Sequence, residues 1–331
     1  MLVRKISFII FLLLLCNFIG FAQEDQVYVL LNAPLIKDLD INTPVTNFPG
    51  DNTLPRNWRI CSDPFKNKEE GTLPTRDGLD TLNISGSGSF STGQFEKMRE
   101  ALGDRKVIIV DLRQEFHGIL NNMCIGWENI RNNPNAGKTQ EEILLQEKEL
   151  LDKVKEEKEV TINNMIKKTD ASGTVTREFI KIPVHVESVM TEEELVTGYN
   201  YGYYRITVTD GYRPDDKQVD NFITFYKNLS PDTWLHFHCK AGRGRTTTFM
   251  TMYDMMRNYD KAGRDDIIKR QWLLGGAKLS EKPVDEAEKD RWDFIVKFYD
   301  YCRQNGPDYK ILWSEWINAE EPVRQKLING Y

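Results

Sequence analysis

The chain has 331 residues, of which 40% are hydrophobic and 28% are charged. This composition is typical of a globular protein and excludes a disordered, collagen-like or multi-span membrane protein. The 44 Lys and Arg residues are outnumbered by 50 Asp and Glu residues, so the net charge is −6. That balance argues against nucleic-acid binding driven by overall charge, and an anionic ligand therefore needs a local basic pocket.

The first 22 residues have the layout of a secretory signal peptide. Two basic residues precede an apolar run over residues 6–15, and small residues end the segment. The alternative, an uncleaved membrane anchor, is disfavoured because Asn17 interrupts a stretch that is already short for a span. We expect cleavage of residues 1–22 and export of the domain 23–331 to the periplasm or the medium, without stable membrane association.

Four elements are predicted in the first half of the mature chain. Ser91 is placed to cap a helix that runs through Leu102, and residues 106–112 form an apolar run typical of a buried strand. Residues 138–159 are dense in Glu, Lys and Leu, which predicts a helix with a solvated surface. Residues 174–189 alternate and are rich in β-branched side chains, which predicts a strand.

The second half alternates between strands and helices. We expect strands over 203–209 and 234–238, and helices after Pro214-Asp215, over 246–256, over 267–274 and along an apolar row from Trp292 to Cys302. This alternation predicts an α/β domain with a central sheet flanked by helices.

Cysteine and histidine give no sign of a metal site. The mature chain keeps four cysteines: Cys61, Cys124, Cys239 and Cys302. They form no Cys-x-x-Cys pair, and neither they nor the four histidines have the spacing of zinc ligands. We expect no cofactor.

One motif, residues 238–246, stands between the strand 234–238 and the helix that follows it. Its sequence is His-Cys-Lys-Ala-Gly-Arg-Gly-Arg-Thr, a Cys-x5-Arg-Thr pattern. A tight arc at a helix N-terminus turns its N–H groups inward and forms a nest for a phosphate dianion. Two glycines in the arc permit backbone angles that a side chain would oppose. The residues expected to line the nest are His238, Lys240, Ala241, Gly242, Arg243 and Gly244.

The same motif supplies reactive groups. The inward dipoles favour a thiolate at Cys239, whose sulfur is then a nucleophile at neutral pH. Arg245 is placed to close the nest with a bidentate fork on two phosphoryl oxygens, and Thr246 to donate a hydrogen bond to the sulfur. The purely structural alternative is a buried cysteine beside a glycine turn.

Attack on a phosphomonoester also requires a proton for the leaving alkoxide. Asp210 ends the predicted strand 203–209 and begins the loop that leads to Pro214, so it is the best candidate for the general acid. An aspartate at a strand end is also a common turn or cap residue, and the spacing leaves both roles open.

Several segments resemble the protein-tyrosine-phosphatase-like phytases of bacteria, which are cysteine-dependent inositol polyphosphate phosphatases. These segments are residues 54–59, 78–87, 110–118, 204–210, 235–247 and 275–276, together with Trp313 and Trp316. The correspondence spans roughly residues 54–316 and is poorest over residues 128–190, which we interpret as a variable inserted region.

The resemblance implies the tyrosine-phosphatase fold with a small partial β-barrel subdomain, and stepwise dephosphorylation of myo-inositol hexakisphosphate (phytate) without a metal. It implies Cys239 as the nucleophile, Arg245 as the phosphate clamp and Asp210 as the general acid. It also places Arg59 and Asp111 in the substrate pocket.

The residue after the acid departs from the family pattern. Related enzymes have His there, whereas this chain has Gly211. Arg213 is the nearby cation that could replace the missing contact to a substrate phosphate.

Two other kinds of function remain open. A Lys-Ala-Gly-basic-Gly-Arg loop also resembles that of inositol-lipid 3-phosphatases, so a phosphoinositide phosphatase or a protein-tyrosine or dual-specificity phosphatase is the nearest alternative. Three loop cations, Lys240, Arg243 and Arg245, favour a soluble ligand with several phosphates, and no membrane-docking surface is evident. A catalytically silent phosphate-binding module is disfavoured because it would not use a nucleophile or an acid.

Overall fold

The structure is a computed structural model that describes residues 35–36, 45–46, 52–68, 71–127, 135, 137–169, 175–280, 282–320 and 323–324. The predicted signal peptide, residues 1–22, lies outside these ranges. Within them, no helix combines the length and the apolar character needed to cross a membrane.

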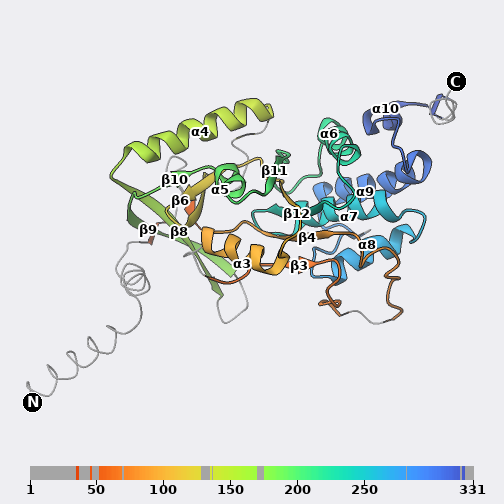
Figure 1. Ribbon diagram of the computed structural model, residues 1–331, viewed down its shortest axis with the longest axis horizontal. Coiled ribbons are helices and arrows are strands. Elements are labelled where there is room, and N and C mark those ends of the chain that lie inside the picture. The colour runs from red at the N-terminus through yellow and green to blue at the C-terminus, as the bar shows by residue number, and fades with distance from the viewer. Residues whose placement is uncertain are drawn as a thin grey trace, which may run out of the picture.

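A five-stranded sheet forms the centre of the molecule, in the order β11-β5-β12-β4-β3 (Figure 1). Its strands are β3 (Arg59–Ile60), β4 (Ile84–Gly88), β5 (Val107–Asp111), β11 (Gly202–Arg205) and β12 (Trp234–Cys239). The first four strands of that order are parallel, and β3 is antiparallel to β4. β12 is buried along its whole length and β5 along nearly all of it, as expected of a parallel sheet that is buried on both faces. Both strands were predicted.

Helices pack around this sheet, as the predicted α/β class requires (Figure 1). They are α3 (Thr92–Leu102), α5 (Glu192–Gly198), α6 (Asp216–Lys227), α7 (Gly244–Asn258), α8 (Arg264–Leu273), α9 (Glu286–Asn305) and α10 (Trp313–Asn318). The predicted caps are present: Ser91 begins α3 with a capping box, and Asp215 does the same for α6. Helix α7 is buried along nearly its whole length and packs on β12, β4, α8 and α9.

A second, seven-stranded sheet lies beside the first, in the order β1-β9-β8-β2-β7-β6-β10. Its strands are β1 (Leu35–Ile36), β2 (Val45–Thr46), β6 (Phe116–Leu120), β7 (Met123–Trp127), β8 (Glu159–Thr169), β9 (Val175–His185) and β10 (Val189–Met190), and α4 (Gln140–Glu156) packs across β6 and β10. All pairings are antiparallel except that of β2 with β8. No pairing joins β1 to β10 among the described residues, so the partial β-barrel remains a prediction.

Three predicted elements differ from the observed ones. The strand predicted over 203–209 ends at Arg205, because its partner β5 ends at Asp111 and the N–H of Ile206 makes the last bond, to the Asp111 carbonyl. The strand predicted over 174–189 is split into β9 and β10.

The third difference concerns the charge-dense helix, α4. It is not solvated on all sides, because Glu147 is buried in the same row as Ile143, Leu151 and Val154. This row follows helical spacing, which places the four residues on one face.

Candidate active site

The loop between β12 and α7 is fixed from outside through its carbonyl oxygens. Arg56 donates to the Lys240 carbonyl at 2.5 Å, Asn57 to the Ala241 carbonyl at 2.7 Å, and Arg59 to the Gly242 carbonyl at 2.8 Å. Because successive carbonyls are bound on the outer side, the arrangement favours N–H groups that turn toward the inside of the arc, as a phosphate nest requires.

Gly242 is required by both its backbone and its surroundings. Its φ is +70°, and a Cβ there would lie 2.3 Å from the backbone of Ser87 and of Gly88. Only glycine fits such a place. Gly244 is different, because it has no positive φ and a Cβ would meet only Arg291 at 3.5 Å, an ordinary contact. The sequence-based requirement for glycine therefore holds at the first position and not at the second.

Cys239 lies at the base of the loop with 3% of its surface exposed. Burial alone would raise the pKa of its thiol. The positive charge of Arg245 and a 3.2 Å hydrogen bond from Thr246 Oγ1 to the sulfur outweigh burial, so the pKa is lowered from its ordinary value of 9.0. The structure thus brings together Cys239, Arg245 and Thr246, the three predicted reactive residues of the motif, and it favours the thiolate.

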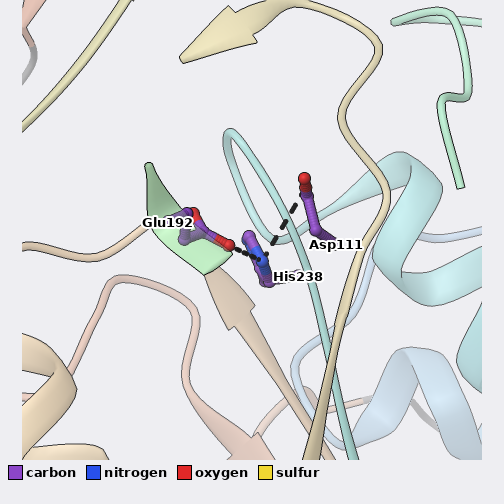
Figure 2. A group of neighbouring side chains, drawn as sticks. All are labelled: Asp111, Glu192 and His238. Carbon is purple, nitrogen blue, oxygen red and sulfur yellow. Dashed lines mark ion pairs between the residues drawn. The ribbon is translucent and has the colours of Figure 1, made fainter. Parts of the chain in front are cut away.

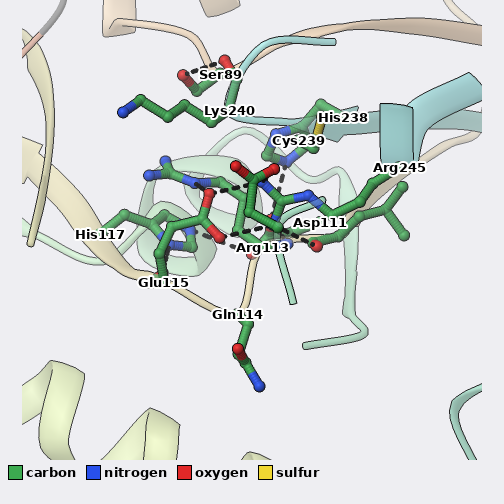
Figure 3. A network of polar contacts seen from close by, with 12 residues as sticks. Ser89, Asp111, Arg113, Gln114, Glu115, His117, His238, Cys239, Lys240 and Arg245 are labelled. Carbon is green, nitrogen blue, oxygen red and sulfur yellow. Dashed lines mark hydrogen bonds and ion pairs between the residues drawn. The ribbon is translucent and has the colours of Figure 1, made fainter. Parts of the chain in front are cut away.

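Arg245 is held by a carboxylate that the sequence interpretation gave no role. Its Nη1 and Nη2 bind Glu115 Oε2 and Oε1 at 2.6 and 2.8 Å, and Arg113 Nε lies 3.2 Å from Glu115 Oε1 (Figure 3). Burial would raise the pKa of Glu115, but Arg245 and Arg113 hold it far below its ordinary range. A bidentate pair of this kind fixes the plane of the guanidinium.

Asp210 lies at the mouth of this arrangement. Its Oδ1 is 3.0 Å from Arg245 Nη2, and its side chain is 44% exposed. Arg245 Nη1 also donates to the Val208 carbonyl at 3.0 Å, which ties the chain just before the acid to the motif. The candidate acid and the candidate phosphate clamp therefore meet, although they are 35 residues apart in the numbered sequence.

Beneath the loop, two predicted pocket residues are fully buried. Arg59 donates to Thr247 Oγ1 as well as to Gly242, and burial lowers its pKa to about 10. Asp111 accepts from Tyr203 Oη at 3.0 Å and pairs with Arg205 Nε at 3.0 Å. Both side chains contact the protein around the motif, and their assignment to the substrate pocket remains a prediction.

Arg205 and Glu147 continue this buried network toward α4. Arg205 binds both oxygens of Glu147, at 2.6 and 3.0 Å, and donates to the carbonyls of Arg113 and Glu115. Burial would lower the pKa of Arg205, but the two carboxylates raise it above its usual range. Helix α4, which packs on the second sheet, therefore supplies the carboxylate of Glu147 to the buried network beneath the Cys-x5-Arg-Thr motif.

His238 lies between two carboxylates, one on each side (Figure 2). Its Nε2 is 2.7 Å from Glu192 Oε1 and 3.8 Å from Asp111 Oδ1, and all three side chains are buried. Within the described ranges, these residues are a group whose donor atoms lie within 4.8 Å of one another, close enough to consider a metal ion. Arg205, Tyr203 and His117 already occupy the Asp111 carboxylate, so the arrangement is that of an ion-pair network.

The remaining predicted residues lie at the rim. Lys240 and Ala241 are half-buried and Arg243 is exposed. Arg213 pairs with Asp216 at 3.2 Å and with Asp290 at 3.1 Å, so its predicted contact with substrate remains a prediction.

The participants that the sequence interpretation missed include four charged residues: Glu115, Arg205, Glu147 and Glu192. Glu147 had a usable signal, because its place in the apolar row of α4 predicts burial. Glu115 and Arg205 lie in segments that were already identified, whereas Glu192 lies between two predicted strands, and only the distant partners of these three residues reveal their roles.

The comparisons with known proteins give the following similarities. Residues 110–257 match the family model of the protein-tyrosine-phosphatase-like phytases, whose description is inositol hexakisphosphate. The effector protein hopD2 of Pseudomonas syringae pv. tomato is 30% identical over 251 residues, which are 72% of this chain and 52% of hopD2.

Two solved structures are similar. The protein-tyrosine-phosphatase-like myo-inositol phosphatase of Mitsuokella multacida, in complex with myo-inositol-(1,3,4,5)-tetrakisphosphate, has a TM-score of 0.73 and 35% identity over 84% of this chain and 49% of that one. A protein-tyrosine-phosphatase-like phytase of Bdellovibrio bacteriovorus has a TM-score of 0.64 and 29% identity over 87% of this chain and 96% of that one. The chain thus spans about half the length of the effector and of the Mitsuokella structure, and nearly all of the Bdellovibrio one. Over residues 110–257 the chain matches the family model of the protein-tyrosine-phosphatase-like phytases, and it is similar to solved structures of these enzymes.

Proposed function

We propose that the protein is a cysteine-dependent phosphomonoesterase that removes phosphate stepwise from myo-inositol hexakisphosphate and lower inositol polyphosphates. The observation that carries this proposal is the buried Cys239, whose pKa is lowered by Arg245 and Thr246 although burial opposes that shift. A thiolate at the base of an arc of inward N–H groups is placed to attack a bound phosphoryl group.

The first step transfers phosphate to the enzyme. The Cys239 sulfur forms a bond to phosphorus while the bond from phosphorus to the inositol oxygen breaks, and Asp210 gives its proton to that oxygen. In the second step water attacks phosphorus, Asp210 takes a proton from the water, and the phosphorus–sulfur bond breaks. Thr246 Oγ1 stabilises the leaving sulfur by the same 3.2 Å hydrogen bond.

Substrate choice follows from charge at the rim. Lys240 and Arg243 add two cations beside the buried Arg245, more than one phosphate needs. They support a ligand with several phosphates, and their attraction should weaken as salt rises. The Mitsuokella relative was solved with a tetrakisphosphate of inositol, which supports the same class of substrate.

The test is phosphate release by the mature protein at moderate salt in EDTA, from phytate, a phosphotyrosyl peptide and a soluble trisphosphorylated inositol lipid. Cys239→Ser is the blank for each substrate. Fastest release from phytate is the expected result. Fastest release from the lipid or the peptide would mean that the substrate class is wrong, although the cysteine mechanism would still hold. Appreciable turnover by Cys239→Ser would overturn the cysteine mechanism.

Export is part of this proposal. The signal-peptide pattern of residues 1–22 supports it, as does the name of the relative hopD2, an effector protein. Mass spectrometry of the protein recovered from periplasm and medium should find an N-terminus at Gln23. Recovery of the intact N-terminus in the membrane fraction would contradict cleavage.

A further inference from the structure

The loop that carries Asp210 is attached to helix α9 at two points. We call residues 210–213 the acid loop. Arg291 Nη2, from α9, donates to the Gly211 carbonyl at 2.5 Å and more weakly to the Tyr212 carbonyl at 3.4 Å. The preceding residue on α9, Asp290, pairs with Arg213 Nε at 3.1 Å. The Arg213 guanidinium also lies over the Phe294 ring, 5.4 Å from its centroid.

Arg291 also lies near residues 239–245, between β12 and α7, which we call the phosphate loop. Its guanidinium atoms lie 3.5–3.7 Å from the place that a Cβ on Gly244 would occupy, so the arginine lies next to the point where this loop enters α7. The residue is only 8% exposed, and its Nε has no hydrogen-bond partner. No carboxylate lies within 4 Å of its guanidinium among the described residues, and backbone carbonyls of the acid loop are its recorded acceptors.

Burying a cation without an ion pair costs free energy, and burial lowers the pKa of Arg291. Solvation by two consecutive carbonyls offsets part of that cost only while the acid loop keeps its present position. The buried arginine and the loop position therefore stabilise each other.

The acid loop needs such an attachment. Gly211 directly follows the acid, has a φ of +85°, and a Cβ there would meet nothing within 4 Å. A glycine in open surroundings leaves the backbone next to Asp210 free to rotate unless another contact fixes it. Arg291 supplies that contact at the glycine's own carbonyl.

We propose that Arg291 is a positioning residue that holds the acid loop so that Asp210 stays over the phosphate loop, with the Asp290–Arg213 pair as a second attachment. The inference rests on the proposed function, since it assigns Arg291 to the proton-transfer step of that reaction. It also places Arg213 in the attachment of the loop.

The effect should be confined to substrates that need the acid. An inositol oxygen leaves poorly without a proton, whereas p-nitrophenolate leaves well without one. Acid catalysis is typically worth about 10²–10⁴-fold, so Arg291→Met should lower kcat for phytate by about 10–100-fold and kcat for p-nitrophenyl phosphate by no more than about 3-fold. Arg291→Lys, which can reach one carbonyl, should restore part of the loss.

The matched control is Lys297→Met, which removes a cation from an exposed position of the same helix. It should change neither rate. Thermal unfolding of every variant reports whether the fold persists. If Arg291→Met does not fold, Arg291→Lys and Asp290→Asn are compared instead, because each weakens one attachment of the acid loop. Each should lower kcat for phytate more than kcat for p-nitrophenyl phosphate.

Asp210→Asn separates this inference from the proposed function. That variant should itself lose far more activity on phytate than on p-nitrophenyl phosphate, and adding Arg291→Met to it should cost little more, because both act on one step. If Asp210→Asn reduces both substrates equally, the acid in the proposed function is wrong.

If Asp210→Asn behaves as expected, two outcomes would overturn the role of Arg291 alone. Equal losses on both substrates would mean that Arg291 shapes the phosphate loop. A KM for phytate raised tenfold or more, at unchanged kcat, would mean that it binds a substrate phosphate.

Discussion

Arg245 and Glu115 face each other as a bidentate pair, in which Nη1 donates to Oε2 and Nη2 donates to Oε1. Both side chains are essentially buried, and Arg113 shares the same carboxylate. Glu115 therefore neutralises charge and fixes the plane of the arginine that is proposed to clamp phosphate.

Replacing Glu115 by Gln should destabilise the protein and impair catalysis together. Two buried arginines would lose their shared counter-charge, and breaking a buried pair costs about 3–5 kcal/mol of unfolding free energy. Urea denaturation at neutral pH measures the loss, and phosphate release measures the activity. Glu141→Gln, at an exposed position of α4, is the control and should leave the unfolding free energy nearly unchanged.

The same pair predicts how stability responds to acid. The folded-state pKa of Glu115 lies far below its ordinary value of 4.5. Its contribution is therefore fully present above the unfolded pKa and is lost as the pH falls below about 4.5 toward the folded pKa. The difference in stability between wild type and Glu115→Gln should shrink over that acid range, and a constant difference would contradict the assignment.

Cys239 should be the one fast-reacting thiol among the described cysteines. Burial raises the pKa of Cys61, Cys124 and Cys302, whereas that of Cys239 is lowered. The rate of alkylation by iodoacetamide should therefore rise with a midpoint below pH 9, with the label on Cys239 by mass spectrometry. Thr246→Val should move the midpoint upward because the hydrogen bond to the sulfur is lost. An unchanged midpoint would show that Thr246 does not lower the pKa of Cys239.

Glu192 should determine the charge of His238. Burial alone would lower the pKa of His238, but Glu192 at 2.7 Å, and Asp111 farther away, raise it above its ordinary value of 6.5. The stability gained from this pair is fully present below pH 6.5 and is lost as the pH rises through the higher folded pKa.

Glu192→Gln tests that role. The difference in unfolding free energy from wild type should be largest below pH 6.5 and decline at higher pH, and the imidazole titration seen by NMR should move to lower pH. Glu193→Gln is the matched control, because it changes the same charge at the next, exposed residue. A stability difference that does not vary with pH would show that His238 is neutral in the folded protein.

Gly242→Ala should abolish activity by distorting the phosphate loop. The left-handed backbone alone costs about 1–2 kcal/mol for a residue with a Cβ, and the overlap with Ser87 and Gly88 adds to that cost. Gly263→Ala, where φ is −67° and no heavy atom lies within 4 Å, is the control and should be nearly silent. Circular dichroism and phosphate release distinguish loss of the fold from loss of the loop. Wild-type turnover by Gly242→Ala would refute this account of the loop.

What the sequence could predict was local. The strand, loop and helix around Cys239 are contiguous, so motif spacing and hydrophobic runs were enough to place them. Glu115 and Arg245 are 130 positions apart, and nothing in either segment indicates which arginine the carboxylate meets. The end of β11 was missed for a similar reason: alternation continues to Thr209, but pairing stops where β5 stops. Roles set by distant partners require the fold.

The bond between Glu147 and Arg205 limits how far this protein can be trimmed. Helix α4 falls in the region interpreted as a variable insertion, which an engineer seeking a minimal catalyst would remove first. Its deletion would remove one of the two buried carboxylates that pair with Arg205 and leave Asp111 as the other. A shortened version would therefore have to supply a new carboxylate in place of Glu147, so the size of the smallest working unit is set by charge balance as well as by the catalytic motif.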